Sequence, residues 1–136
     1  MQELKRKKME NNPEKSRVLT QRYAEKRAKL VKSKTVTYDL SLRLQPGTEY
    51  DGFLRVTFEL SHLRSNDLFI DFSGKSIDSL RINFHTIKAI EWNGSFLKLK
   101  RNYLIGNGVN TVEIAFHNVY SNDGCGLHSY IDPKDN

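Results

Sequence analysis

The sequence has very little cysteine and no long hydrophobic run. Cys125 is the only cysteine among 136 residues, which excludes a disulfide within the chain and a zinc site built mainly from cysteines. No apolar stretch approaches the length of about 18 residues that a membrane-spanning helix needs. The opening segment MQELKRKKMENNPEK lacks the apolar stretch of a secretory signal. These absences predict an intracellular protein, cytoplasmic or cytoskeletal, with no membrane span.

The motifs of the common enzyme classes are absent as well. The sequence contains no H-E-x-x-H for zinc, no G-x-S-x-G for a serine nucleophile, and no phosphate-binding loop that ends in Gly-Lys-Ser or Gly-Lys-Thr. The four histidines, His62, His85, His117 and His128, are far apart and lack ligand spacing. We therefore expect surface or structural histidines, no enzyme activity in this chain, no cofactor and no small-molecule substrate.

Positive charge is concentrated at the N-terminal end. The chain carries 22 Lys and Arg against 16 Asp and Glu, a net charge of +6. Residues 1–34 hold twelve of the basic residues and only four acidic ones, so the rest of the chain is slightly acidic. Residues 1–15 have too few apolar side chains to form a core, which predicts a disordered basic tail. The tail contains four consecutive basic residues, Lys5, Arg6, Lys7 and Lys8.

Residues 16–34 have the spacing of a basic amphipathic helix. Ser16 and Thr20 are both suited to its N-cap. The apolar side chains recur every three or four residues and would share one face: Leu19, Tyr23, Ala24, Ala28 and Val31. The opposite face would carry Arg22, Lys26 and Lys29. The tail and this face predict binding to a protein with an acidic surface, such as a cytoskeletal polymer or a ribonucleoprotein. The same charges would also suit nucleic-acid phosphates.

From residue 35 the hydrophobic period changes to two, which predicts an all-β domain over residues 35–136. Segments 36–44 and 53–60 alternate apolar and polar residues and flank a Pro-Gly loop, so we expect an antiparallel hairpin of half-buried strands. The short apolar segment 67–72 predicts a more central strand. Further strands are expected at 77–84, 88–93, with Trp92 in the core, 95–100 and 111–120, where Val112, Ile114 and Phe116 share a face. At least seven short strands favour an antiparallel sandwich or open barrel.

The final segment, GCGLHSYIDPKDN, gathers residue types that often form sites. Cys125 lacks a basic neighbour other than His128 that could activate a thiolate. Asp123, Asp132 and Asp135 do not have the spacing of a calcium loop. We interpret the segment as a structural corner in which glycines permit a turn and an Asx side chain braces the proline. Its members are Gly124, Gly126, His128, Asp132 and Pro133.

Several segments, taken in order, resemble one module of a known family. They are LTQRYAEKRAKLV, YDLSLRL, DGFLRVTFEL, LFIDF, YLIGNGVNTVEIAF and YSNDGCGLHSYIDPKD. The pattern is similar to the N-terminal β domain of the aminopeptidase N and leukotriene-hydrolase family of zinc metallopeptidases, over about residues 19–135. Ser129 stands where that family usually has an arginine after Gly-Leu-His.

The resemblance implies a saddle-shaped antiparallel β domain that packs beside a catalytic domain. In that family, the H-E-x-x-H and G-x-M-E-N motifs lie in the next domain, so the resemblance supplies no catalytic or metal residue here. We expect a non-catalytic interaction module, a subunit of a larger intracellular assembly that docks through its β surface and basic arm. The alternatives are an N-terminal fragment of a zinc aminopeptidase and a nucleic-acid-binding protein. A reading frame that continues past Asn136 into H-E-x-x-H would favour the fragment.

Overall fold

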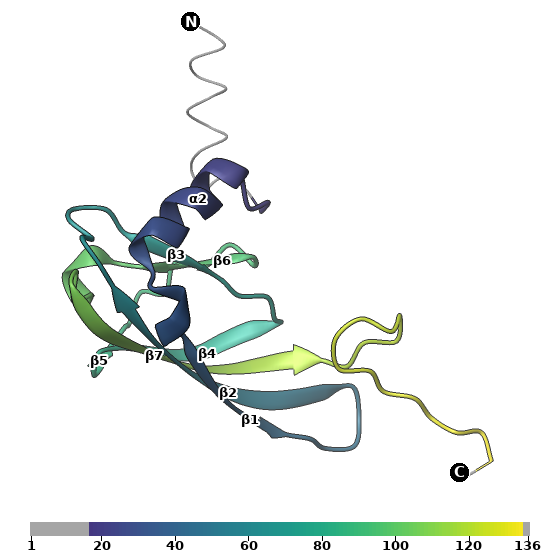
Figure 1. Ribbon diagram of the computed structural model, residues 1–136. Coiled ribbons are helices and arrows are strands. Elements are labelled where there is room, and N and C mark those ends of the chain that lie inside the picture. The colour runs from purple at the N-terminus through teal and green to yellow at the C-terminus, as the bar shows by residue number, and fades with distance from the viewer. Residues whose placement is uncertain (1–16, 135–136) are drawn as a thin grey trace, which may run out of the picture.

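The computed structural model describes residues 17–134 (Figure 1). Ser16 and the basic run at residues 5–8 lie outside the described residues. One helix, α2 (Gln21–Leu30), and a short 3-10 turn, η1 (Ser33–Thr35), precede the strands. The seven strands are β1 (Thr37–Arg43), β2 (Glu49–Leu60), β3 (Leu68–Asp71), β4 (Ser76–Ile82), β5 (His85–Thr86), β6 (Phe96–Leu99) and β7 (Gly108–Val119), with a second 3-10 turn, η2 (Arg101–Tyr103), between β6 and β7.

The strands form two antiparallel sheets, which confirms the predicted sandwich-like all-β fold. The larger sheet has the order β1-β2-β7-β4-β5, and β3 pairs with β6 in a sheet of two strands. β2 and β7 are paired over twelve residues, from Glu49 opposite Val119 to Leu60 opposite Gly108. β1 pairs with β2 as the predicted hairpin, with Leu40 opposite Leu54. The β2–β7 ladder is therefore the longest strand pairing of the described residues, and it forms the centre of the larger sheet.

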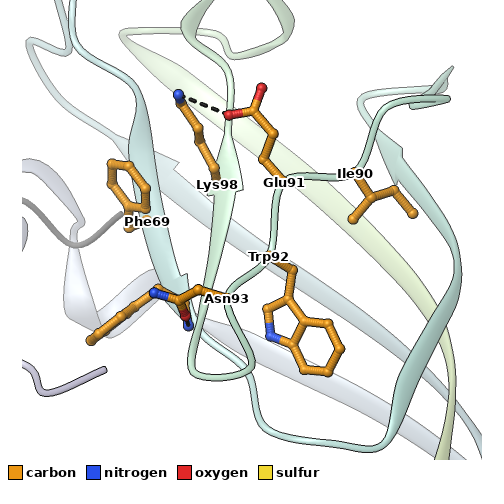
Figure 2. Close-up of a pocket in the computed structure, with 7 residues that line it drawn as sticks. Phe69, Ile90, Glu91, Trp92, Asn93 and Lys98 are labelled. Atoms are coloured by element: carbon orange, nitrogen blue, oxygen red, sulfur yellow. Dashed lines mark hydrogen bonds and ion pairs between the residues drawn. The ribbon is translucent and has the colours of Figure 1, made fainter. Parts of the chain in front are cut away.

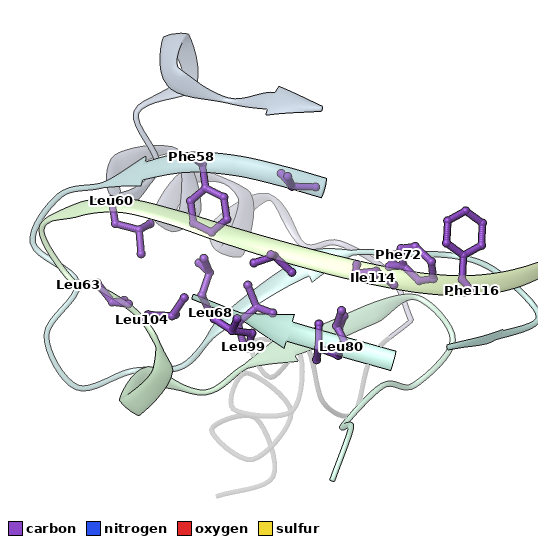
Figure 3. Close-up of a cluster of buried hydrophobic side chains, with 14 of the residues drawn as sticks. Phe58, Leu60, Leu63, Leu68, Phe72, Leu80, Leu99, Leu104, Ile114 and Phe116 are labelled. Carbon is purple, nitrogen blue, oxygen red and sulfur yellow. The ribbon is translucent and has the colours of Figure 1, made fainter. Parts of the chain in front are cut away.

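The hydrophobic core lies between the two sheets (Figure 3). Val56, Phe58 and Leu60 of β2 are buried, as the alternation in the sequence predicts, and so are the apolar residues of β7 that were expected to share a face. The small sheet covers them with Leu68, Leu97 and Leu99, whose side chains are almost completely buried. The core residues of β7 are Val112, Ile114 and Phe116, and β4 adds Leu80 and Ile82. Two strands are thus enough to close a core over the middle of the larger sheet.

Three strand predictions differ from the structure. Segment 67–72 is not a central strand: β3 belongs to the small sheet, where its apolar residues are buried by the larger sheet beneath and by α2 at its edge. Residues 88–93 do not form a strand. They bond to β6 locally, through the Trp92–Leu97 bridge, the amide of Lys98 and the hydrogen bonds between Asn93 and Phe96. β1 is not half-buried, because all seven of its residues are exposed.

The helix is shorter than the predicted segment 16–34. It begins after Thr20, whose hydroxyl accepts a hydrogen bond from the Tyr23 amide, and Val31 caps its other end. Tyr23 and Ala24 are half-buried as expected, whereas Leu19 and Ala28 are exposed. The reason is that α2 contacts the body along one narrow side, at the edge of β3, instead of lying flat on a sheet (Figure 1).

Candidate docking surface

The inner face of β1 carries an apolar row that no other part of residues 17–134 covers. We call Tyr38, Leu40 and Leu42 the apolar border; their exposed fractions are 71%, 55% and 39%. Tyr38 lies opposite Val56, which is buried. Paired residues of an antiparallel ladder point to the same side, so the border continues the core face of the larger sheet out into solvent.

The border is uncovered because the two sheets differ in width. Neighbouring strands lie about 4.8 Å apart, so two strands cover less than half of a five-stranded sheet. The small sheet sits over β2, β7 and β4, and β1 extends beyond it at the free side of the larger sheet (Figure 1). The sequence predicted the correct apolar phase of β1, but the covering layer that would bury it is absent from the described part of the chain.

A groove of about 650 Å³ runs from the apolar border to α2. Its floor is the inner face of β1 and β2, and one wall is formed by the helix and β3. Arg27 and Asp71 are the only charged groups in its lining, and they pair with each other at 2.5 Å. The apolar lining residues are Ala24, Ala28, Val31, Val36, Tyr38, Leu54, Val56, Phe58, Leu68, Ile70 and Phe72.

Two helix side chains fix this wall by bonding to the free edge of β3. The amide of Phe69 donates to the Tyr23 hydroxyl at 2.8 Å, and Arg27 donates to the carbonyl of Phe69 at 3.0 Å. The rings of Tyr23 and Phe69 meet edge to face, and burial raises the pKa of Tyr23. Sequence reasoning missed Arg27, because one more arginine in a basic helix gives no sign that it points inward.

The other basic residues of α2 point to solvent, as predicted. Arg22, Lys26 and Lys29 are exposed, and no acidic side chain within residues 17–134 pairs with them. The basic residues of the sheets behave differently, because most are paired with carboxylates. Examples are Arg55 with Glu113 at 3.0 Å and Lys100 with Glu91 at 2.8 Å. The solvent-facing side of α2 therefore carries three positive charges that no carboxylate of the described residues compensates.

The outer face of the larger sheet is polar and ion-paired. His117, on β7, lies between two carboxylates, with Nδ1 against Asp51 and Nε2 3.1 Å from Asp78. The guanidinium of Arg43, together with the His117 ring, holds the pKa of the Asp51 carboxyl below its usual value. Only this histidine of the four has carboxylate partners in the described region, and its position on the polar phase of β7 agrees with the structural interpretation. Because these charges already have partners, this face is less suited to docking than the inner one.

A smaller cavity of about 390 Å³ lies beside β6 (Figure 2). Phe69, Trp92 and Lys98 lie around it, and the Lys98 amine is 2.9 Å from the Glu91 carboxylate. Lys98 and Lys100 together hold the pKa of Glu91 low, the Lys100 hydrogen bond contributing most. Trp92 is partly buried against the core, and it donates its indole N–H to the Phe72 carbonyl at 2.8 Å. The lining provides no nucleophile paired with a base.

The C-terminal segment forms a turn and then an extended arm. Gly124 and Gly126 have positive φ angles, and the carboxylate of Asp123 accepts from the Ser121 hydroxyl and the Cys125 amide, which lowers its pKa. The amide of Lys134 donates to Asp132 at 2.9 Å.

This hydrogen bond is the expected Asx turn around Pro133. The backbone of Ser121 bridges to His128, which closes the turn. Cys125 is exposed.

No group of three or more His, Cys, Asp or Glu side chains in residues 17–134 is arranged to hold a metal ion. The helices of the described region include none that is long and apolar enough to cross a bilayer.

A scan against protein-family models and a search of curated proteins found no match for this chain.

Proposed function

We propose that this chain is a non-catalytic docking module that binds an acidic protein partner inside the cell. The observation that carries the proposal is the apolar border, which extends the core face of the sheet into solvent and opens into the groove beside α2. A contiguous exposed apolar surface on a folded domain is typical of an interaction site. Apolar side chains of the partner would fill the groove, and Arg22, Lys26 and Lys29 would attract its negative charge.

A protein partner fits this surface better than a nucleic acid does. Single-stranded nucleic acid is held by aromatic platforms next to free basic groups. Tyr38 is the only aromatic residue of the apolar border, and the one basic group in the groove, Arg27, is already engaged by Asp71 and by the carbonyl of Phe69. The unpaired basic residues of α2 lie on the side of the helix that faces away from the groove, so they would attract a partner at long range and would not contact it in the groove.

The uncovered inner face also supports a second candidate. In a zinc aminopeptidase, which the sequence resembles, a catalytic domain packs beside the β domain, and on this proposal the inner face is where it would dock. On that proposal the partner is joined in the same polypeptide and the module again contributes no catalytic group. A transcript that continues past residue 136 and encodes H-E-x-x-H would select this candidate over a separate partner.

The test is a photo-crosslinker placed at residue 38 or at residue 130 of the full chain. Tyr38 and Tyr130 are of one residue type and are similarly exposed, at 71% and 75%, but only Tyr38 lies on the inner face. In an extract of the native cells, position 38 should give one discrete adduct with an acidic protein and position 130 should not. Added salt and the triple variant Arg22→Glu, Lys26→Glu, Lys29→Glu should each reduce its yield.

Two outcomes would count against this proposal. Adducts of the same pattern from both positions would mean that the inner face has no special role. An adduct that disappears after ribonuclease treatment would assign the surface to RNA.

A further inference from the structure

The two edges of the larger sheet differ. At one side, β5 is only two residues long and pairs with Arg81 and Ile82 of β4, whose remaining edge is interrupted by a bulge between Ile77 and Ser79. β1, at the other side, pairs with β2 over seven residues without a bulge, and none of the strands in residues 17–134 pairs with its other side. Natural edge strands are usually protected by proline, lysine, a bulge or an inward-pointing charge. The segment TYDLSLR contains no proline or lysine, and its two charges, Asp39 and Arg43, point to the outer face.

We propose that a second copy of this chain pairs with β1 in an antiparallel ladder whose two-fold axis passes through Leu40. The two five-stranded sheets would then form one continuous sheet of both copies. The inference stands apart from the proposed function, because the second copy would bond to the backbone edge of β1 and contact only the flanks of the apolar border, whereas the partner would cover the tops of these side chains.

The sequence of β1 is self-complementary in this register. Leu40 faces Leu40 of the second copy, and Tyr38 faces Leu42, so apolar side chains meet on the inner face. On the outer face, Asp39 faces Ser41 and Thr37 faces Arg43, so no like charges are directly opposed. Centring the axis on Leu40 also pairs all seven residues of the strand, and any other centre leaves residues at its ends unpaired. Because register is fixed by matching faces and charges, this arrangement is the one that the strand favours.

The paired edge would bring two apolar borders side by side. Each border would bury the flanks of its exposed side chains against the other, although their tops would remain open to a partner. A single strand pair buries less than the roughly 800 Å² per partner of a standard stable interface. We therefore expect a concentration-dependent dimer with a dissociation constant in the micromolar range, about 1–100 µM.

The first test is the mass of the purified full chain by sedimentation equilibrium. The mass should rise from 15.8 kDa toward twice that value as the concentration increases from about 1 to 100 µM. Leu40→Asp places two carboxylates opposite each other and should raise the dissociation constant about tenfold or more. Ile105→Asp is the matched control, because Ile105 is similarly exposed, at 50%, and lies outside the edge. It should leave the dissociation constant unchanged.

The second test reads the register by disulfide formation in a Cys125→Ser background, which removes the exposed thiol. Opposed residues of a ladder have Cα atoms about 5 Å apart, within the range of a disulfide. Leu40→Cys should therefore form a covalent dimer on mild oxidation, and Ser41→Cys, which faces Asp39, should not.

The proposal is overturned by a wild-type chain that stays monomeric to about 100 µM, by equal effects of Leu40→Asp and Ile105→Asp, or by efficient crosslinking through Ser41→Cys. Pairing of β1 with a strand from a different protein, in place of a second copy, would overturn it as well.

Discussion

Replacing Asn110 with aspartate is expected to destabilise the domain by about 4 kcal/mol. Asn110 is fully buried on β7, and its amide side chain makes four hydrogen bonds. Its oxygen accepts from the Ile105 amide at 2.7 Å and from Asn83 at 2.8 Å, and its nitrogen donates to the carbonyls of Ile105 and Gly108. Aspartate cannot make the two donations, and it buries a charge against two carbonyl oxygens.

Asn118→Asp is the matched control on the same strand. Asn118 is only half-buried, where it donates to the Tyr50 hydroxyl at 3.1 Å and accepts from the Val119 amide. Its replacement should cost less than about 1 kcal/mol, because water can reach the new carboxylate. Urea unfolding of both variants measures the difference. Equal losses in the two variants would show that the Asn110 network does not hold the turn between η2 and β7.

Gly52→Ala is expected to cost about 2–3 kcal/mol through overpacking. A Cβ atom at this position of β2 would lie 2.1 Å from the ring of Phe116, its partner on β7. The Phe116 ring is buried and packs edge to face on Phe72 at 5.3 Å between centroids, so it has little freedom to move away. Gly52 does not have a positive φ angle, and the loss therefore measures the packing of the ring alone.

Gly74→Ala serves as the control for this packing prediction. The nearest atom to a Cβ there, on the ring of Phe72, is 3.4 Å away, which is an ordinary contact. We expect a change within about 0.5 kcal/mol. If Phe116→Leu is added to Gly52→Ala, the two losses should be less than additive, because the smaller side chain makes room for the new methyl group. Additive losses would mean that the ring does not pack on Gly52.

The alternation of polar and apolar residues predicted the strands better than it predicted their burial. β1 and β2 have the same alternating pattern, yet Phe58 is buried and Tyr38 is exposed. The pattern identifies which residues share a face, but only the number and position of the covering strands decide whether that face is buried. β3 shows the reverse case, since its short apolar run is buried at the edge of a small sheet and not at the centre of a large one.

The contacts that position the wall of the groove could not be predicted from the sequence either. Thr20 was recognisable as a helix cap, and the solvent-facing basic residues followed from helical spacing. Arg27 and Tyr23 instead bond to the backbone of Phe69, more than forty positions away, and no local pattern reports such a partner. Asn110 gave no local sign of its role either, because its burial depends on how the segment before β7 folds back on the strand.

The central claim is that the apolar border binds a partner and does not stabilise the folded domain, and one pair of variants tests it most directly. The variant Tyr38→Ser, Leu40→Ser should change the free energy of unfolding by less than about 1 kcal/mol, because both side chains are exposed. Val56→Ser, at the buried residue opposite Tyr38, should lose about 2 kcal/mol or more. With the photo-crosslinker at residue 42, the double variant should lose most of the adduct with the acidic partner protein, which its mass distinguishes from a crosslink between two copies of the chain. A loss of several kcal/mol of stability in the double variant, or an unchanged adduct yield, would contradict the central claim.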